Sequence, residues 1–172
     1  MRFTLHASRF TLGMPLQIHH SKSSQTISRG LRPCLEELLT CSGRGEAFLE
    51  LSFVGRARMR SLNRAYLGHD RVTDVLSFPL DVQKPRRGAP WHLGEVVICT
   101  EVARGQAREA GRRVIAQILR LAIHGFVHLH GLDHEAGPQE AARFHRLEAK
   151  YLRHLHRKKF REVPSWDGSL QL

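Results

Sequence analysis

Residues 123–135 read IHGFVHLHGLDHE and place three histidines at a spacing that suits a single metal ion. On a helix with 3.6 residues per turn, His124 and His128 differ by about 40° in azimuth and therefore point the same way. Gly131 can adopt a left-handed conformation, which would end the helix and turn the chain back. His134, just past this turn, can then supply a third imidazole. We predict a metal site at the end of a helix in the C-terminal half.

The ligand set indicates a catalytic rather than a structural metal. Three protein ligands leave one tetrahedral position for water, whereas structural zinc more often uses cysteines and closes that position. The expected catalytic group is a zinc-bound water held by His124, His128 and His134, with one Zn²⁺ per chain. Imidazoles suit zinc, although copper, nickel or iron could occupy the site. Asp133 could orient a ligand imidazole or make a hydrogen bond within the turn.

Segments on both sides of this motif alternate between extended and helical patterns. Strands are expected around Leu16 and Ile18 and over residues 47–55, 72–80 and 94–100. Helices are expected from Ser28, as a capping residue, to about Thr40, and over residues 56–67, 100–111, 113–130 and 138–156. About four strands among about five helices predict an α+β fold (mixed α/β), with a central sheet covered by helices. The strand order cannot be read from this pattern.

The length of 172 residues suits one domain with a sizeable core. We expect residues 14–162 to form this domain and residues 163–172 to be a loose tail. Residues 1–13 are expected to be a disordered or spurious extension, with translation starting at Met14. An organellar transit peptide is the alternative, because residues 1–35 contain no acidic side chain. No apolar run approaches the roughly 18 residues of a membrane span, so no membrane partner is expected.

The charge balance favours a polyanionic partner. Twenty-seven Lys and Arg residues against sixteen Asp and Glu residues give a formal net charge of +11. Nucleic acid is the leading candidate for such a partner, and general solubility is the alternative. The three cysteines form no CxxC pair and are odd in number, which favours reduced thiols in the cytoplasm over a disulfide framework.

The histidine spacing also suggests a protease, because HxxxHxxGxxH matches the zinc-binding motif of metzincin metalloproteases. These enzymes carry a Glu directly after the first histidine, where it deprotonates the metal-bound water. Here that position is Gly125. Without this general base the peptidase mechanism is disfavoured, and a metzincin-like protease remains only a minor alternative.

Three blocks of the sequence resemble one known family. HGFVHLHGLDH (residues 124–134) is similar to the HGxLHLxGYDH signature of the YbeY family, bacterial rRNA maturation factors that are metal-dependent endoribonucleases. LNRAYLGHDRVTDVLSFPL (62–80) resembles the family's LNxxYRxKDxPTDVLSFP segment, and LGEVVIC (93–99) resembles its LGDIVIS strand. The blocks occur in the family's order, and together they are highly specific.

The resemblance implies a fold, a metal and a substrate. The family's fold is a central sheet of about four strands with surrounding helices, and its zinc ligands correspond to His124, His128 and His134. The implied function is single-strand-specific cleavage in rRNA maturation, at the 3′ end of 16S rRNA, and ribosome quality control. The small ribosomal subunit, one of its proteins and a ribosome-assembly GTPase are the expected partners. Either a metal hydroxide or the RNA 2′-OH could be the nucleophile.

One departure from the family pattern concerns phosphate binding. The family usually has an arginine after the Tyr of NxxYR, whereas this chain has Leu67. Either Arg64 or Arg71 replaces it, or phosphate stabilisation is weakened. Arg112 and Arg113 are further candidate RNA contacts. The departure leaves open a non-catalytic, zinc-containing factor for ribosome assembly and RNA binding.

Overall fold

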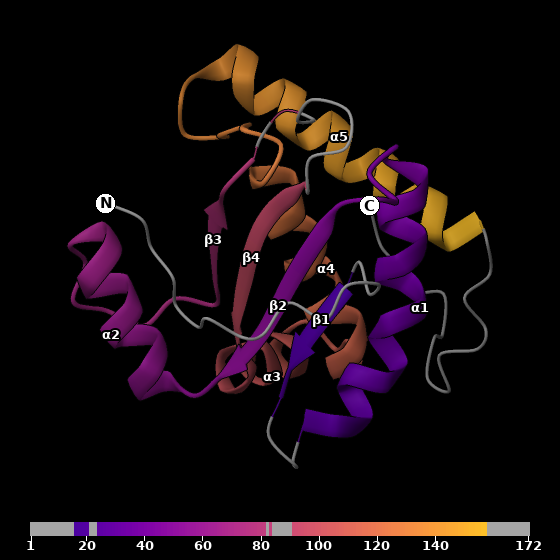
Figure 1. The fold of residues 1–172 in the computed structure, drawn as a ribbon. Coiled ribbons are helices and arrows are strands. Elements are labelled where there is room, and N and C mark those ends of the chain that lie inside the picture. Colours follow the sequence, from indigo (N-terminus) through magenta and orange to yellow (C-terminus); the bar gives the residue numbers. More distant parts are fainter. Residues whose placement is uncertain (1–15, 21–23, 82, 84–90, 158–172) are drawn as a thin grey trace.

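The structure is a computed structural model that describes residues 16–20, 24–81, 83 and 91–157, and within these residues it contains four strands and five helices (Figure 1). The predicted α+β class is therefore confirmed. The expected extension at residues 1–13 and the expected tail at 163–172 lie outside the described residues. The elements in chain order are β1 Leu16–His19, α1 Gln25–Cys41, β2 Phe48–Val54, α2 Arg56–Leu67, β3 Val75–Pro79, β4 His92–Cys99, α3 Thr100–Glu109, α4 Val114–His128 and α5 Pro138–Arg157.

The strands form one mixed sheet in the order β1-β2-β4-β3. β1 pairs with β2, and β2 with β4, in parallel, whereas β3 runs antiparallel to β4. The register of this last pair places Val75 opposite Ile98 and Leu76 opposite Val97. The backbone N–H of Cys99 extends the ladder by donating to the carbonyl of Asp74 at 2.8 Å. β3 therefore forms one edge of the sheet.

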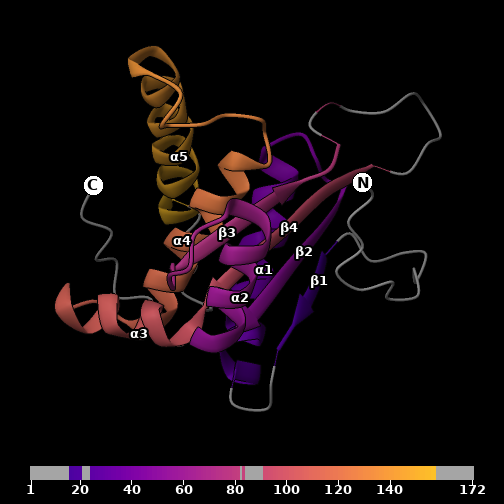
Figure 2. The ribbon, with the colours of Figure 1, turned by 90° about the vertical axis from the view of Figure 1, so that its left-hand side faces the viewer.

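Helices cover the two faces of the sheet unequally. α1 and α4 lie on one face, and α5 packs outside them against both, whereas α2 lies on the other face (Figures 1 and 2). Alternation along β4 explains how both faces become apolar, since successive side chains point to opposite sides. Val96 and Ile98 face the larger cluster with α1 and α4, and Val97 and Cys99 face the smaller cluster with α2.

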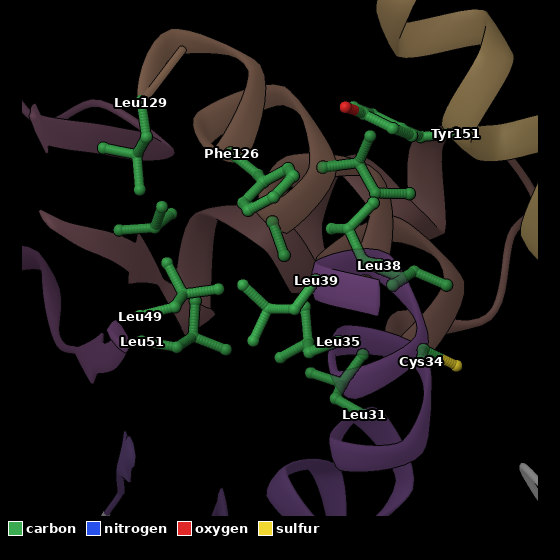
Figure 3. Packing of buried hydrophobic residues seen from close by; sticks show 14 of the residues in the cluster. Leu31, Cys34, Leu35, Leu38, Leu39, Leu49, Leu51, Phe126, Leu129 and Tyr151 are labelled. Carbon is green, nitrogen blue, oxygen red and sulfur yellow. The ribbon is translucent and has the colours of Figure 1, made fainter. Parts of the chain in front are cut away.

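The larger core cluster joins α1, β2, α4 and α5. Leucines at helical spacing on α1 meet Leu49 and Leu51 of β2 and Phe126 of α4, with Tyr151 of α5 at the edge (Figure 3). Burying each such side chain contributes roughly 1.5–3 kcal/mol. This cluster holds α4 against the sheet and so fixes the helix that carries two of the predicted metal ligands.

Helix α1 differs from its prediction at the N-terminus. The sequence suggested Ser28 as the capping residue, but the helix begins at Gln25, and Ser24 precedes it without a side-chain capping hydrogen bond. Ser28 is instead buried inside the helix. The capping preference of serine was outweighed because Ile27 packs against the core one residue earlier, so the helical turn extends to include it.

Helix α2 has the predicted bounds. It begins after Gly55 and ends before Gly68, whose φ of 73° lies in the left-handed region that ends a helix without steric cost in glycine. Met59 and Leu62 face the sheet and contact the smaller cluster. Within the described residues, no helix has the length and apolar character that crossing a membrane requires.

Candidate metal centre

The three predicted ligand histidines converge at the C-terminal end of α4. His124 and His128 occupy its last two turns, Gly131 follows with a φ of 77°, and His134 comes after this left-handed turn. Their ring centroids lie 5.0, 5.1 and 5.2 Å apart. One nitrogen of each ring lies within 4.8 Å of the corresponding nitrogens of the other two, so the three imidazoles could hold one metal ion.

The hydrogen bonds of two ligand rings leave their Nε2 atoms available to a metal. Nδ1 of His124 lies 3.1 Å from Oε1 of Glu148, and Nδ1 of His128 lies 3.0 Å from the carbonyl oxygen of Leu132. Because a carboxylate and a carbonyl only accept hydrogen bonds, each Nδ1 carries the proton and each Nε2 has a free lone pair. This donor set fits a metal that prefers imidazole, such as zinc.

The electrostatics of the centre favour a neutral imidazole at His128. Burial lowers the pKa of His128, and the positive charges that His124 and His134 can carry lower it further. A neutral imidazole is the form that binds a metal, so deprotonation is already favoured before any ion arrives. Burial acts to raise the pKa of Glu148, but its contacts with His124 and then His145 outweigh this effect and lower the pKa.

Helix α5 packs against the three histidines. Phe144 is 0% exposed, and its ring centroid lies 4.9, 4.6 and 4.9 Å from those of His124, His128 and His134. Glu148 lies four residues later on the same helix, and thus on the same face. The three histidine rings therefore contact one buried aromatic ring, and one of them contacts a carboxylate. Both of these side chains belong to α5, which begins after the metal motif ends.

A cleft of about 660 Å³ opens over the three histidines. Its walls are the end of α2 with the following loop, strand β3, and the turn from Gly131 to Glu135. In Figure 1, the orange segment between α4 and α5 lies above β3. All three ligand residues line this cleft, so a bound ion would be accessible to a substrate. A smaller hollow of about 300 Å³ lies on the α2 face and contains none of them.

Gly125 faces the sheet, and there is no space for a side chain at this position. A Cβ atom built on it would lie 2.6 Å from Cγ1 of Val96 and 2.9 Å from Oγ of Ser77. The packing therefore excludes any side chain here, including the glutamate that metzincins use as general base. This geometry argues against the metzincin-like protease alternative.

Asp133 occupies the turn between the ligands. Its Oδ1 accepts a hydrogen bond of 2.9 Å from the backbone N–H of Glu135, which is the local role that the sequence left as the alternative. The Nδ1–H of His128 donates to the carbonyl of Leu132 instead. Orientation of a ligand imidazole by Asp133 stays a prediction.

The structure separates the four arginines that were proposed as RNA contacts. Arg71 lines the cleft, and Arg64 is exposed on α2 outside the cleft lining. Arg112 and Arg113 lie at the opposite end of α4, roughly 16 Å along the helix axis from His124 at 1.5 Å per residue. Leu67 lines the cleft and is 56% exposed, so the position of the family's arginine does face this space.

His130 points away from the three ligand histidines and forms its hydrogen bonds with other groups. Its Nδ1–H donates to the carbonyl of Phe126 at 2.8 Å, and its Nε2 accepts from Arg44 Nε at 3.0 Å and from the Tyr151 hydroxyl at 3.1 Å. Burial, then the charge of Arg44, lowers its pKa to about 4. His130 therefore links the turn after α4 to α5 and to the loop after α1.

Phe144 and Glu148 were not predicted from the sequence. Both lie in the last helix, which was expected over residues 138–156 with no role at the metal site. The sequence does single out Glu148, because it is the only acidic residue between positions 141 and 157. Its partner His124, 24 positions earlier, could not have been identified without the packing of α5 on α4.

The match to a known family covers nearly all described elements. A family model described as "Endoribonuclease YbeY" matches residues 16–156, which include the sheet, the cleft and all three histidines. The chain belongs to the YbeY family. Membership confirms the resemblance that the three sequence blocks indicated.

Relatives in the YbeY family come from several bacteria. A protein of Anaeromyxobacter sp. (strain Fw109-5), named "Endoribonuclease YbeY", is 41% identical over 129 residues, which are 75% of this chain and 65% of the relative. A protein of the same name from Aquifex aeolicus is 39% identical and covers 66% of this chain and 73% of the relative. The chain thus spans slightly less than two thirds of the Anaeromyxobacter relative's length.

A solved structure has a similar fold. The solution structure of TM1509 from Thermotoga maritima superposes with a TM-score of 0.62 at 27% sequence identity. The superposition covers 91% of this chain and 99% of the other. The arrangement of sheet and helices described above is therefore that of a known structure.

Proposed function

We propose that this chain is a zinc-dependent endoribonuclease that cleaves single-stranded RNA in rRNA maturation, at the 3′ end of 16S rRNA, and in ribosome quality control. The observation that carries the proposal is the convergence of three imidazoles on an open cleft. The family and its relatives carry the name Endoribonuclease YbeY, which supports the reaction class.

The residues of the cleft suit phosphodiester cleavage. His124, His128 and His134 would hold the metal at the base, and Arg71 on the wall would neutralise a phosphate. Zinc bound there would supply a water of lowered pKa and a Lewis acid for a phosphoryl oxygen. This chemistry needs no carboxylate at position 125, where the packing admits only glycine.

The net charge supports a polyanionic substrate. With a formal charge of +11, the chain attracts RNA over long distances, and its affinity for RNA should fall steeply as salt rises. Partners that fit this role are the small ribosomal subunit, one of its proteins and a ribosome-assembly GTPase, in the cytoplasm. Co-sedimentation with small subunits, in low and in moderate salt, tests this association.

A second candidate is a non-catalytic, zinc-containing assembly factor that binds RNA. The observation that favours it is Leu67, an exposed apolar side chain in the cleft at the place of the family's arginine. In this case the cleft would bind RNA without stabilising the charge that develops during cleavage.

Cleavage of single-stranded rRNA by zinc-loaded protein, compared with a His128→Ala variant, tests the proposal. We expect the variant to lose at least 100-fold in rate, because two imidazoles hold zinc poorly. Equal cleavage by both proteins would eliminate the zinc nuclease and indicate contaminating ribonuclease. Equal inactivity with retained binding to small subunits would favour the assembly factor.

Two further assays resolve the remaining alternatives. A product with a 2′,3′-cyclic phosphate would identify the RNA 2′-OH as the nucleophile, and a linear 5′ phosphate product would identify water. Digestion of casein by the zinc-loaded protein would revive the protease alternative, which Gly125 disfavours.

A further inference from the structure

Helix α5 brings a carboxylate onto one of the metal-binding rings. Oε1 of Glu148 lies 3.1 Å from Nδ1 of His124, across 24 positions of sequence. The Glu148 side chain is only 22% exposed, and its position is fixed because neighbouring residues Phe144, Tyr151 and Leu152 of α5 are buried in the core. The carboxylate therefore meets the ring in a partly desolvated setting, where a charge-assisted hydrogen bond is strong.

In His128, the Nδ1 nitrogen has a weaker hydrogen-bond acceptor than it has in His124. His128 Nδ1–H donates to the neutral carbonyl of Leu132, only four residues away in the turn. A carboxylate polarises an imidazole more than a carbonyl does, and it raises the basicity of the opposite nitrogen. The lone pair on Nε2 of His124 thus depends on Glu148, a side chain outside the metal motif.

We propose that Glu148 is a positioning residue of the metal centre, which selects the tautomer of His124 and aims its Nε2 at the ion. The inference rests on the metal binding contained in the proposed function and does not depend on RNA cleavage. Without the carboxylate, His124 can rotate or move its proton to Nε2, and either change removes one ligand.

The second carboxylate oxygen has a looser contact. Oε2 of Glu148 lies 3.6 Å from Nδ1 of His145, whose side chain is 63% exposed. The ring of His145 stacks on that of His134, with centroids 6.1 Å apart and an interplanar angle of 18°. Solvent competes for this contact, so we assign the positioning effect to the bond with His124.

Zinc affinity, measured by competition with a chromophoric chelator at neutral pH, tests the assignment. We expect Glu148→Gln, which keeps the size of the side chain, to bind zinc 10–100-fold more weakly than wild type. The matched control is Glu140→Gln on the same helix, which changes the net charge equally and whose carboxylate lies 3.5 Å from Arg143 instead of against a ligand histidine. Both the control and a His145→Gln variant should stay within twofold of wild type.

Two measurements show whether Glu148 acts through His124. In a His124→Ala background, adding Glu148→Gln should change zinc affinity by less than twofold, because the ring that Glu148 orients is gone. In the metal-free protein, ¹⁵N NMR of the imidazoles should detect the Nδ1–H tautomer of His124 in wild type and a mixture in Glu148→Gln.

Several outcomes would overturn the proposal: a Glu148→Gln affinity within twofold of wild type, an equally large loss in the His124→Ala background, or an unchanged tautomer. Failure of the proposed function would look different. Wild type would then bind one zinc with the predicted dependence on Glu148, yet leave single-stranded rRNA uncut.

Discussion

Gly125 of α4 packs tightly against the sheet, so adding a single methyl group here should have a large effect on stability. Gly125→Ala would place Cβ against Val96 and Ser77. The overpacking cost of roughly 1–3 kcal/mol should exceed the helix-propensity gain of about 0.5–1 kcal/mol. Urea unfolding should therefore show a net loss of stability.

The matched control is Gly105→Ala in α3, where nothing lies within 4 Å of the new Cβ. That variant should be slightly more stable than wild type, since only the propensity gain remains. Similar changes for both glycines would contradict the close approach of α4 to the sheet.

His130 predicts a pH dependence of folding. Its pKa falls from the ordinary value of 6.5 to about 4, because burial disfavours the charged ring and the nearby charge of Arg44 disfavours it further. A lowered pKa means that the stabilisation is present above pH 6.5 and is lost as the pH falls towards 4. The loss should be roughly 2 kcal/mol in urea unfolding with chelator present.

A His130→Gln variant isolates this effect, since a glutamine oxygen can accept the same hydrogen bonds but does not titrate in this range. Its stability should fall less between pH 7 and pH 4.5 than that of wild type. Parallel pH profiles for the two proteins would show that His130 is not the group responsible.

Replacing Leu67 by arginine should strengthen RNA binding. Leu67→Arg would place a cation on the wall of the cleft, in place of the exposed apolar side chain now found there. Binding to single-stranded RNA should tighten, and the slope of log K against log salt should steepen by about 0.7. The control is Ala65→Arg, which adds the same charge on the exposed side of α2. Equal gains for both variants would mean that only net charge matters.

At the scale of elements, α5 supports the metal centre from outside the motif. Phe144→Ala should cost roughly 3–5 kcal/mol of stability and also weaken zinc binding about tenfold, because all three ligand rings lose a packing partner.

The control is Leu155→Ala, which removes an equally buried side chain of the same helix, far from the ligands. It should lose comparable stability while keeping zinc affinity, as urea unfolding and chelator competition would show. Loss of zinc affinity in both variants would indicate general unfolding.

The elements also show which features local sequence can predict. α2 was predicted with correct bounds because Gly55 and Gly68 end the apolar pattern on both sides, and such signals are local. The clustering of the three histidines was predictable for the same reason, since a helical pair and a glycine turn lie within eleven residues. The strand order, the start of α1 and the contact of Glu148 with His124 depend on packing between distant segments, which no local pattern contains.

At the scale of the whole molecule, the metal should act as a crosslink. The ligands come from α4 and the following turn, and these rest on α5, so a bound ion stabilises the packing of the C-terminal half. Zinc at about 100 times its dissociation constant should add roughly 2.7 kcal/mol to the free energy of unfolding. Thermal unfolding should shift upward by about 5–10 °C and return on addition of EDTA. A His134→Ala variant should show a much smaller shift, and an equal shift would place the ion elsewhere.

The hydrogen bonding of the antiparallel edge strand β3 determines how readily another chain could pair with it. Because Asp74 and Cys99 form a hydrogen-bonded pair in its ladder, the backbone groups of Val75, Ser77 and Pro79 point outward. The Val75 N–H donates to the Asp74 carboxylate instead, and Pro79 has no N–H. Among the residues of β3, this leaves the N–H of Ser77 to donate outward, so this border offers a poor template for pairing with a neighbouring copy and disfavours fibril-like stacking beside the cleft.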